Sequence, residues 1–395
     1  MKDSPVRVLY SFPHKLGAGR ASNSAWEHVR SLAAAGAQLL VFPGVLHRPL
    51  PPNVKVRPTL AWGKARISYK LMGTMRALAL HDHIVARRVK KLAGQIDIIH
   101  TWPVAAEQTL KIAAKLGIPT VLERTNAHTR YAYETYAREF KRLGVTVPPG
   151  HEYYYNTDIL KKEEKEYELA YKILCPSDFV VKTFLDQGFS REKLVRHTLG
   201  FDEKQFYPDN QPRDRKRGLT AIAVGVQAVK KGLHYALEAW LKSPAHIDGT
   251  FLIVGEFLPA YAEKLSGMLS HPSVKVLGFR NDLPELMRKS DIMLLPSIEE
   301  GFGLTCIEAM GSGCVPLVSD ACTDVCKHME NALVHKVGDV DSLTRHITML
   351  DENRDLLETL RGAGLSAAQE VTWDAAGINL LRVYREVIAS TASQS

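Results

Sequence analysis

Short hydrophobic runs recur along the whole chain, and most are separated by stretches in which apolar residues return at helical spacing. The runs are residues 6–10, 38–42, 96–100, 120–122, 173–175, 195–198, 221–224, 251–254, 274–277, 291–295 and 315–318. The unbroken apolar runs among them, such as 221–224 and 251–254, are typical of parallel strands that are buried on both faces. The intervening helix over about 23–35 has Trp26, Val29 and Leu32 on one face. The pattern predicts an α/β fold built from Rossmann-like, doubly wound parallel sheets.

The alternation is interrupted once, at residues 209–218. This stretch reads Asp-Asn-Gln-Pro-Arg-Asp-Arg-Lys-Arg-Gly, and it has no apolar periodicity. Such a polar segment is typical of a linker between domains. A chain of 395 residues is long enough for two or three domains. We therefore expect one domain over 1–208 and a second over 209–372, followed by an amphipathic helix near the C-terminus.

Composition places the chain among ordinary globular proteins, with 45% hydrophobic and 24% charged residues. No apolar run reaches the ~18 residues needed to span a bilayer, and the first residues do not resemble a signal peptide. The five cysteines lack regular spacing, which favours a reducing, cytoplasmic location. A formal net charge of +8 favours anionic partners such as nucleotide phosphates or anionic lipid.

Basic residues are concentrated in the segment 55–91, which contains a single acid, Asp82. They are Lys55, Arg57, Lys64, Arg66, Lys70, Arg76, Arg87, Arg88, Lys90 and Lys91. Apolar residues are interleaved among them at roughly helical spacing. A basic amphipathic helix can lie on an anionic membrane surface, here the inner face of the membrane, or can form a wall for an acidic acceptor. The third interpretation is a solvated helix whose apolar stripe packs on its own domain.

The stretch 296–316 carries the clearest chemistry. After the run 291–295 comes a turn with Gly301 and Gly303, and a helix is expected from Leu304 to residues 311–313. A strand, a glycine turn and a helix together aim free backbone N–H groups at an anion. Glu300 and Glu308 bracket the helix start, and a helical interval of that length spans at most ~12 Å. That is the scale of a sugar nucleotide. The competing interpretation is an ordinary turn with two solvated glutamates.

The spacing Glu300-x7-Glu308, with Gly301-Phe302-Gly303 and Glu308-Ala309-Met310, resembles the signature of the family-4 retaining glycosyltransferases (glycosyl transferases group 1). The resemblance implies a GT-B fold, in which two Rossmann-like domains face each other across a cleft and the C-terminal helix, within 373–395, packs back on the first. It implies retaining transfer of a sugar from a nucleoside-diphosphate sugar to a hydroxyl of a glycan, a lipid-linked or a small-molecule acceptor. It also implies that neither a cofactor nor a metal ion is required.

The resemblance also implies site residues. Lys231 would hold the departing phosphate, Glu300 the sugar hydroxyls and His128 the donor sugar. Further donor-binding positions, shared between the ribose, the phosphates and the nucleobase, are Glu308, Phe302, Gly303, Leu304, Thr305, Gly17, Gly19, Phe279 and Arg280.

Two positions depart from the family pattern. The slot of an arginine that holds the diphosphate contains Val226, and Lys230 or Arg280 are the cations that could replace it. Arg124 occupies roughly the slot of the family's histidine, and His128 lies a few residues later. The stretch 131–155, rich in tyrosine and containing Pro148-Pro149-Gly150, predicts an irregular acceptor-side lid.

Other interpretations remain open. One is a GT-B enzyme of different chemistry, such as a sugar phosphorylase or a sugar-nucleotide epimerase. Another is a non-catalytic protein that binds anions or membranes through its basic face. A nucleic-acid partner is not expected. The spacing Cys322-x3-Cys326 does not match a standard zinc pattern, so the cysteines predict no metal site.

Overall fold

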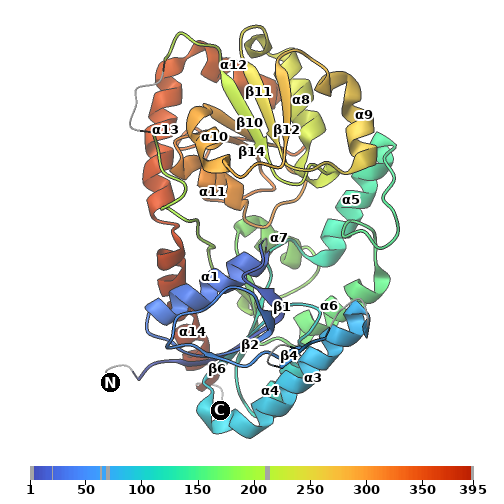
Figure 1. The fold of residues 1–395 in the computed structure, drawn as a ribbon, viewed down its shortest axis with the longest axis vertical. Coiled ribbons are helices and arrows are strands. Elements are labelled where there is room, and N and C mark those ends of the chain that lie inside the picture. Colours follow the sequence, from blue (N-terminus) through green and yellow to red (C-terminus); the bar gives the residue numbers. More distant parts are fainter. Residues whose placement is uncertain (1–3, 20, 63–64, 68–71, 210–213, 393–395) are drawn as a thin grey trace.

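The computed structural model describes residues 4–19, 21–62, 65–67, 72–209 and 214–392. They form two α/β domains stacked along the long axis of the molecule (Figure 1). This confirms the prediction of two Rossmann-like sheets. None of the helices described is long and apolar enough to cross a membrane.

The first domain is built on a parallel sheet of order β3-β2-β1-β6-β7-β8-β9. Its strands are β1 Arg7–Leu16, β2 Gln38–Leu46, β3 Lys55–Val56, β6 Ile98–Thr101, β7 Thr120–Glu123, β8 Lys172–Cys175 and β9 Leu194–Arg196. Its helices are α1 Ala21–Ala34, α3 Thr74–Leu92, α4 Glu107–Lys115, α5 Thr129–Leu143, α6 Thr157–Leu169 and α7 Asp178–Leu185. A short antiparallel hairpin, β4 Ala61–Trp62 and β5 Ala65–Arg66, lies outside the sheet.

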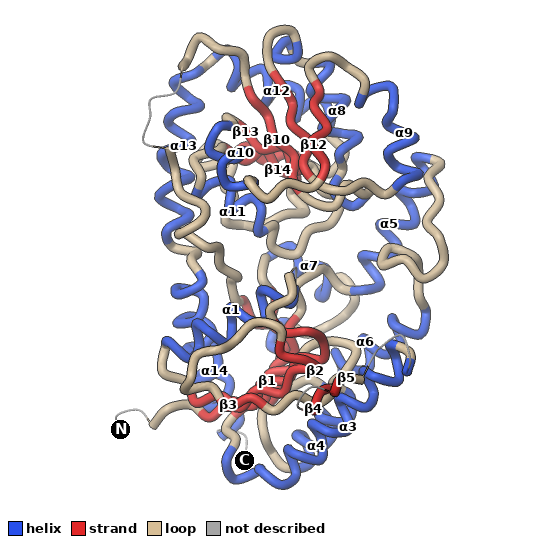
Figure 2. The backbone as a smooth tube through the Cα atoms, viewed as in Figure 1, coloured by secondary structure: helices blue, strands red, loops and turns tan. Residues whose placement is uncertain are grey.

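The second domain repeats the arrangement with the order β12-β11-β10-β13-β14-β15 (Figure 2). Its strands are β10 Thr220–Val224, β11 Thr250–Val254, β12 Val274–Gly278, β13 Ile292–Leu295, β14 Val315–Ser319 and β15 Leu333–His335. Its helices are α8 Leu233–Lys242, α9 Pro259–Leu269, α10 Leu283–Lys289, α11 Leu304–Gly311, α12 Val340–Glu352 and α13 Arg354–Gln369. Both strand orders reverse beside the first strand, and ligands of such sheets bind at the carboxyl ends of the strands at that reversal. In the second domain the reversal lies between β10 and β13.

The chain crosses between the domains at two places that lie side by side. Phe201 pairs with Thr372 in a parallel bridge, and a Cβ atom on Gly200 would overlap the backbone of Trp373. After the second crossing, α14 (Trp373–Ala392) packs against α1, where Gly377 lies against Ser31. The domain boundary itself stays a prediction, because residues 210–213 lie outside the described part of the chain.

The prediction of an irregular lid over 131–155 is wrong for most of its length, since α5 occupies residues 129–143. Tyr133, Tyr136 and Phe140 follow one another at helical spacing and are buried in the same hydrophobic cluster as residues of the second domain. Glu139 on this helix accepts hydrogen bonds from the ring of His234 (2.9 Å) and the hydroxyl of Tyr235 (2.7 Å) on α8. Helix α5 thus bridges the two domains (Figure 1). The aromatic spacing was the better signal, and the Pro-Pro-Gly turn lies beyond the helix.

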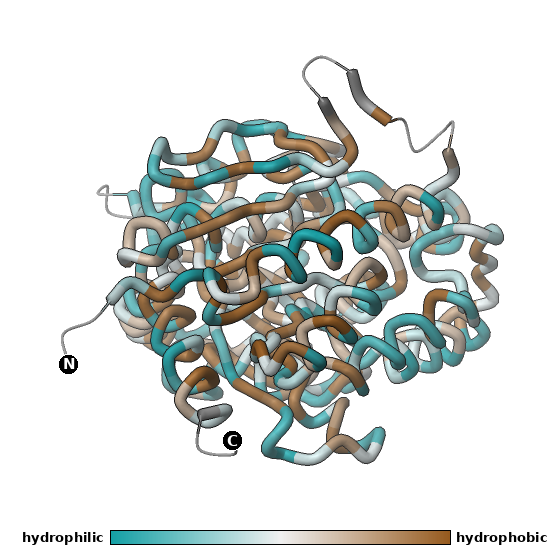
Figure 3. The backbone as a smooth tube through the Cα atoms, turned by 90° about the horizontal axis from the view of Figure 1, so that it is seen from below, coloured by the Kyte–Doolittle hydropathy of each residue, from teal (hydrophilic) through white to brown (hydrophobic). Residues whose placement is uncertain are grey.

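In the described part of the basic segment 55–91, α3 covers the second half. The apolar residues Leu78, Val85 and Val89 of α3 are buried, whereas Met75 is 41% exposed. Arg87, Arg88 and Lys91 are exposed. Seen from below, hydrophilic and hydrophobic residues alternate along the helices of the molecule (Figure 3). The apolar stripe formed by the buried residues of α3 packs on its own domain. Membrane contact through the basic face stays a prediction, and Lys64 and Lys70 lie outside the described residues.

Glu299 links the two domains through a fully buried carboxylate. It pairs with Lys230 of its own domain (2.9 Å). From the first domain it accepts hydrogen bonds from the amide of Ala127 (2.9 Å) and from the hydroxyl of Tyr136. Burial by itself would raise the pKa of Glu299, but Lys230, Tyr136 and the amide hold that pKa below its usual range. The carboxylate is therefore charged and satisfied from both domains.

Replacing Glu299 by Ala leaves Lys230 buried without its partner. Breaking a buried ion pair from one side costs about 3–5 kcal/mol, so we expect a clear drop in the thermal unfolding midpoint. The matched control is Glu285→Ala, which removes an exposed pair with Lys289 and should leave the midpoint nearly unchanged. Equal midpoints for the two variants would show that Glu299 does not hold the domains together.

Candidate active site

Two loops of the second domain meet at the reversal between β10 and β13. The loop after β10 turns at Gly225 (φ 134°), passes through a 3₁₀ turn over Val229–Lys231, and ends at Gly232 (φ 66°). A Cβ atom on Gly232 would overlap the carbonyl oxygen of Pro296, in the loop after β13. The close approach of these backbones requires glycine there, and it brings Lys231 beside Glu300.

Lys231 and Glu300 form the ion pair at the centre of the site. The Lys231 Nζ atom lies 2.5 Å from Glu300 Oε2, and Ser297 Oγ lies 3.4 Å from the same oxygen. The lysine side chain is 18% exposed and the glutamate side chain 12%. Both groups are thus held in place while keeping a path to solvent, as a binding site requires.

The start of α11 lies directly against this pair. Gly303 adopts the left-handed conformation (φ 69°) that favours glycine, and a Cβ atom added to it would lie 3.4 Å from Glu300 Cγ. The first hydrogen bond of the helix runs from the Cys306 amide to the Gly303 carbonyl (2.8 Å). The amides of Leu304 and Thr305 precede it, and the first turn contains no acidic residue. The arrangement can hold an anion between backbone N–H groups and the Lys231 ammonium.

Glu308 lies one turn further along α11 and is partly buried. Burial raises its pKa to about 7, while the charge of Lys231 lowers it and that of Asp202 raises it. Glu308 thus shares an electrostatic environment with Lys231, as expected for two groups on one bound ligand.

His128 does not join this cluster. Its Nδ1 atom accepts a hydrogen bond from the amide of Arg130 (3.2 Å) at the start of α5. Its ring packs against Tyr167, Phe184 and Phe189. Burial, then the charge of nearby arginines, lowers the pKa of His128 to about 3. These contacts are those of a helix-capping residue in the first domain, and they give no geometric support to a catalytic role.

Arg124, in the slot of the family's histidine, is also structural. Its guanidinium donates two hydrogen bonds to the carbonyl of Ala127 (3.0 and 2.7 Å) and lies 3.5 Å from Glu163. It therefore fixes the loop at Ala127, whose own amide donates a hydrogen bond to Glu299.

The glycines of the first domain lie at a turn with both φ angles positive, Gly17 at 83° and Gly19 at 93°. A Cβ atom on Gly17 would crowd Arg48. Arg48 lines a cavity of about 170 Å³ together with Asp202 and Lys204. The cavity therefore lies between Arg48, which is next to the Gly17 turn, and Asp202. The negative charge of Asp202 raises the pKa of Glu308.

The remaining predicted positions are spread over the second domain. Phe302 is buried in its core, whereas Phe279 is 72% exposed at the carboxyl end of β12. Arg280 pairs with Asp282 (2.6 Å). The roles of Phe279 and Arg280 at a nucleobase stay predictions.

Neither cation considered as a replacement for the missing arginine is free. Lys230 is buried and paired with Glu299, and Arg280 is paired with Asp282. Val226, in the arginine slot, follows Gly225, where an added Cβ atom would lie 3.3 Å from Lys231 Cε. Lys231 therefore carries the positive charge of this site without help from these two side chains.

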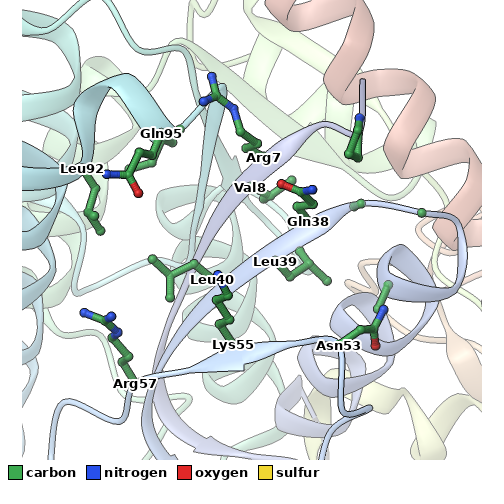
Figure 4. A pocket seen from close by; sticks show the side chains of 15 residues that line it. Arg7, Val8, Gln38, Leu39, Leu40, Asn53, Lys55, Arg57, Leu92 and Gln95 are labelled. Carbon is green, nitrogen blue, oxygen red and sulfur yellow. The ribbon is translucent and has the colours of Figure 1, made fainter. Parts of the chain in front are cut away.

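A larger cavity, of about 680 Å³, lies elsewhere, at the amino ends of β1 and β2 (Figure 4). Arg7, Lys55 and Arg57 line it, and Arg7 is paired with Asp97 (2.5 Å). In open α/β sheets ligands bind at the opposite, carboxyl ends of the strands. This cavity is therefore separate from the site at Lys231.

Local sequence patterns contain no signal for one feature of the site, the fit of the first domain against Gly301. A Cβ atom on Gly301 would overlap the carbonyl oxygen of Thr125, and the Gly301 carbonyl accepts the hydroxyl of Ser177 (2.5 Å). Both contacts join residues more than a hundred positions apart, beyond the range of such patterns.

Comparison with known proteins points to one family. Residues 218–353 match the family model described as Glycosyl transferases group 1. The MMP alpha-(1->4)-mannosyltransferase of Mycolicibacterium hassiacum is 26% identical over 320 residues, which cover 78% of this chain and 75% of that protein. The N,N'-diacetylbacillosaminyl-diphospho-undecaprenol alpha-1,3-N-acetylgalactosaminyltransferase of Campylobacter jejuni is 30% identical over 56% of this chain and 62% of its own.

Solved structures show the same fold at lower identity. Sucrose-phosphate synthase of Thermosynechococcus elongatus superposes with a TM-score of 0.70 at 17% identity, over 98% of this chain and 100% of that one. The HepE protein of Anabaena, solved in complex with UDP, superposes with a TM-score of 0.65 at 16% identity, over 99% of this chain and 100% of that one. At such identities these structures establish the two-domain fold alone.

The raised pKa of Glu308 predicts a pH-dependent stability. The folded-state pKa of about 7 lies above the ~4.3 of an unfolded glutamate, so the contribution of Glu308 is present at low pH and lost as the pH rises through about 7. Relative to Glu308→Gln, the wild type should therefore lose stability between about pH 5 and pH 8. Thermal unfolding midpoints of both proteins across this range measure the difference.

The control for this experiment is Glu370→Gln, at an exposed position on the surface. Its midpoint should follow that of the wild type at every pH. A wild-type midpoint that keeps a constant distance from that of Glu308→Gln would contradict the predicted burial of the carboxyl group.

Proposed function

The chain is a glycosyltransferase of the group 1 family, and we propose that it transfers a sugar from a nucleoside-diphosphate donor to an acceptor hydroxyl with retention of the anomeric configuration. The observation that carries the proposal is the Lys231–Glu300 pair at the start of α11. It combines a cation and free amides for a diphosphate with a carboxylate for sugar hydroxyls.

Stabilising the leaving diphosphate is the main catalytic work in this proposal. The helix end alone contributes about 0.3–1 kcal/mol toward an anion. A preorganised cation contributes more, because it acts in a site from which much of the water is excluded. Lys231 supplies that charge, and the amides of Gly303, Leu304 and Thr305 supply directional hydrogen bonds.

Glu300 and Glu308 bind different parts of the donor. Glu300 lies on the Lys231 side and accepts hydrogen bonds from the sugar, and Glu308 accepts them from the ribose. When the donor binds, Lys231 moves its ammonium from Glu300 to the phosphate oxygens, and Glu300 exchanges the ion pair for hydroxyl donors. No step in this scheme requires a bound divalent metal.

The relatives support the donor class and leave the acceptor undetermined. The HepE structures were solved in complex with UDP, with UDP and glucose, and with UDP-glucose. The acceptors named for the curated relatives differ from one another. We therefore limit the proposal to a nucleoside-diphosphate sugar and a hydroxyl acceptor.

Release of nucleotide from a panel of nucleoside-diphosphate sugars, with and without acceptors, tests the proposal. Lys231→Ala and Glu300→Gln should each lower the transfer rate at least about tenfold, the scale of one lost electrostatic contact in the transition state. NMR of the product should show the anomeric configuration of the donor. Product formed only with phosphate, or without any acceptor, would indicate a phosphorylase or an epimerase instead.

Lys242→Ala is the matched control, because Lys242 lies at the far end of α8 in an exposed pair with Glu238. It should transfer at the wild-type rate. Rates for Lys231→Ala that equal those of Lys242→Ala would mean that the donor site lies elsewhere.

The valine in the arginine slot makes a gain of function testable. Val226→Arg places a second cation near Lys231, and a charge-assisted hydrogen bond is worth about 1.5–3 kcal/mol. We expect calorimetry to show about tenfold or tighter binding of the nucleoside diphosphate. Val226→Leu, which adds bulk without charge, should bind as the wild type does. Weaker binding by Val226→Arg would argue that position 226 does not face the phosphates.

A further inference from the structure

Four ionisable side chains meet in the interior of the first domain, apart from the Lys231–Glu300 pair. They are His28 on α1, His100 on β6, Glu123 at the end of β7 and His197 just after β9. Each is at most 1% exposed. Four segments that are far apart in the sequence thus each contribute a histidine or a carboxylate to one buried cluster.

The spacing of their polar atoms is that of a metal site. Glu123 Oε2 lies 3.4 Å from His197 Nε2, 3.5 Å from His100 Nε2 and 3.9 Å from His28 Nδ1. Ligand atoms about 2.0–2.2 Å from a tetrahedral zinc ion are about 3.3–3.6 Å from one another. One ligand atom from each of His28, Glu123 and His197 lies within 4.8 Å of the other two. His100 is not part of that group of three, so the proposed ligand atoms are those of His28, Glu123 and His197.

The cluster is also unsatisfied. Within the described part of the chain, no hydrogen-bond partner exists for either Glu123 oxygen, either His197 nitrogen, or the Nε2 atoms of His28 and His100. Burying a carboxylate without donors is costly, and buried charges in proteins are normally paired or bound to a metal. A cation at this point would satisfy His28, Glu123 and His197 together.

Tyr384 and Tyr10 contact two of these rings. His100 Nδ1 lies 2.7 Å from the hydroxyl of Tyr384, which leaves Nε2 facing Glu123. The hydroxyl of Tyr10 accepts the indole N–H of Trp102 (2.9 Å) and lies 3.3 Å from His28 Nδ1, so an ion bound through that nitrogen replaces the Tyr10 contact.

We propose that His28, Glu123 and His197 bind one divalent transition-metal ion, with zinc as the best fit to two imidazoles and one carboxylate. The site is buried, so the ion has a structural role. It ties α1 to the end of β7 and to the residues after β9. This differs from the expectation that no metal ion is needed, which rested on the family resemblance and on the spacing of the cysteines, and it does not depend on the proposed transferase chemistry.

A second histidine cluster in the described residues provides the matched control. His335 and His346 in the second domain are largely buried and also have ring nitrogens without partners. They do not form a group of three ligand atoms within 4.8 Å, as the first cluster does. His335→Gln therefore removes an equally buried histidine without removing a ligand of the proposed ion.

The test is the metal content of the full-length purified protein, followed by cobalt substitution. After dialysis against a chelator and addition of Zn²⁺, we expect one equivalent per chain and a higher thermal unfolding midpoint. Co²⁺ in its place should give the strong visible absorption of a tetrahedral site. Glu123→Gln and His197→Gln should lose the equivalent and the response of the midpoint to Zn²⁺, whereas His335→Gln should keep both.

Two results would overturn the proposal. One is a wild-type protein that neither retains an equivalent of Zn²⁺ nor changes its midpoint when Zn²⁺ is added, as expected for a cluster filled by water or protons. The other is equal loss of metal in His335→Gln and Glu123→Gln, which would indicate adventitious binding. The wild-type measurement decides the matter even if the ligand variants fail to fold, and it requires no assay of sugar transfer.

Discussion

The buried carboxylate of Glu299 is the interaction on which the candidate site depends. It belongs to the second domain, yet two of its donors, the Ala127 amide and the Tyr136 hydroxyl, come from the first. Leaving such a charge unpaired costs several kcal/mol. The loop after β13 and the loop after β7 are therefore held together. Gly301 has no side chain, and this allows the backbone at Thr125 to approach it closely.

Of two neighbouring lysine–glutamate pairs, one has a structural role and the other lies in the candidate site. Lys230 pairs with Glu299 in the interior, and Lys231 pairs with Glu300 on the side that keeps access to solvent. The buried Lys230–Glu299 pair fixes the backbone of both loops. Lys231 and Glu300 are therefore already close to each other before a ligand binds. A preorganised cation of this kind stabilises a developing phosphate charge with little reorganisation. The same loops present the start of α11 to the same point.

The sequence predicted the parts of the molecule that depend on local pattern. Buried parallel strands produce continuous apolar runs, and the glycines around Gly303 indicated where α11 begins. Residues whose role depends on distant partners were not predictable in this way. The structural role of Lys230, the capping role of His128 and the bridging position of α5 all arise from contacts between segments far apart in the chain. The group of His28, His100, Glu123 and His197 likewise has no local spacing to reveal it.

A crystal structure of the protein bound to a nucleoside diphosphate tests the central claim most directly. We predict the diphosphate within hydrogen-bond distance of the Leu304 and Thr305 amides and of Lys231 Nζ, with the Lys231–Glu300 pair opened and Glu308 on the ribose. A nucleotide bound instead in the cavity lined by Arg7, Lys55 and Arg57, with the Lys231–Glu300 pair intact, would contradict it.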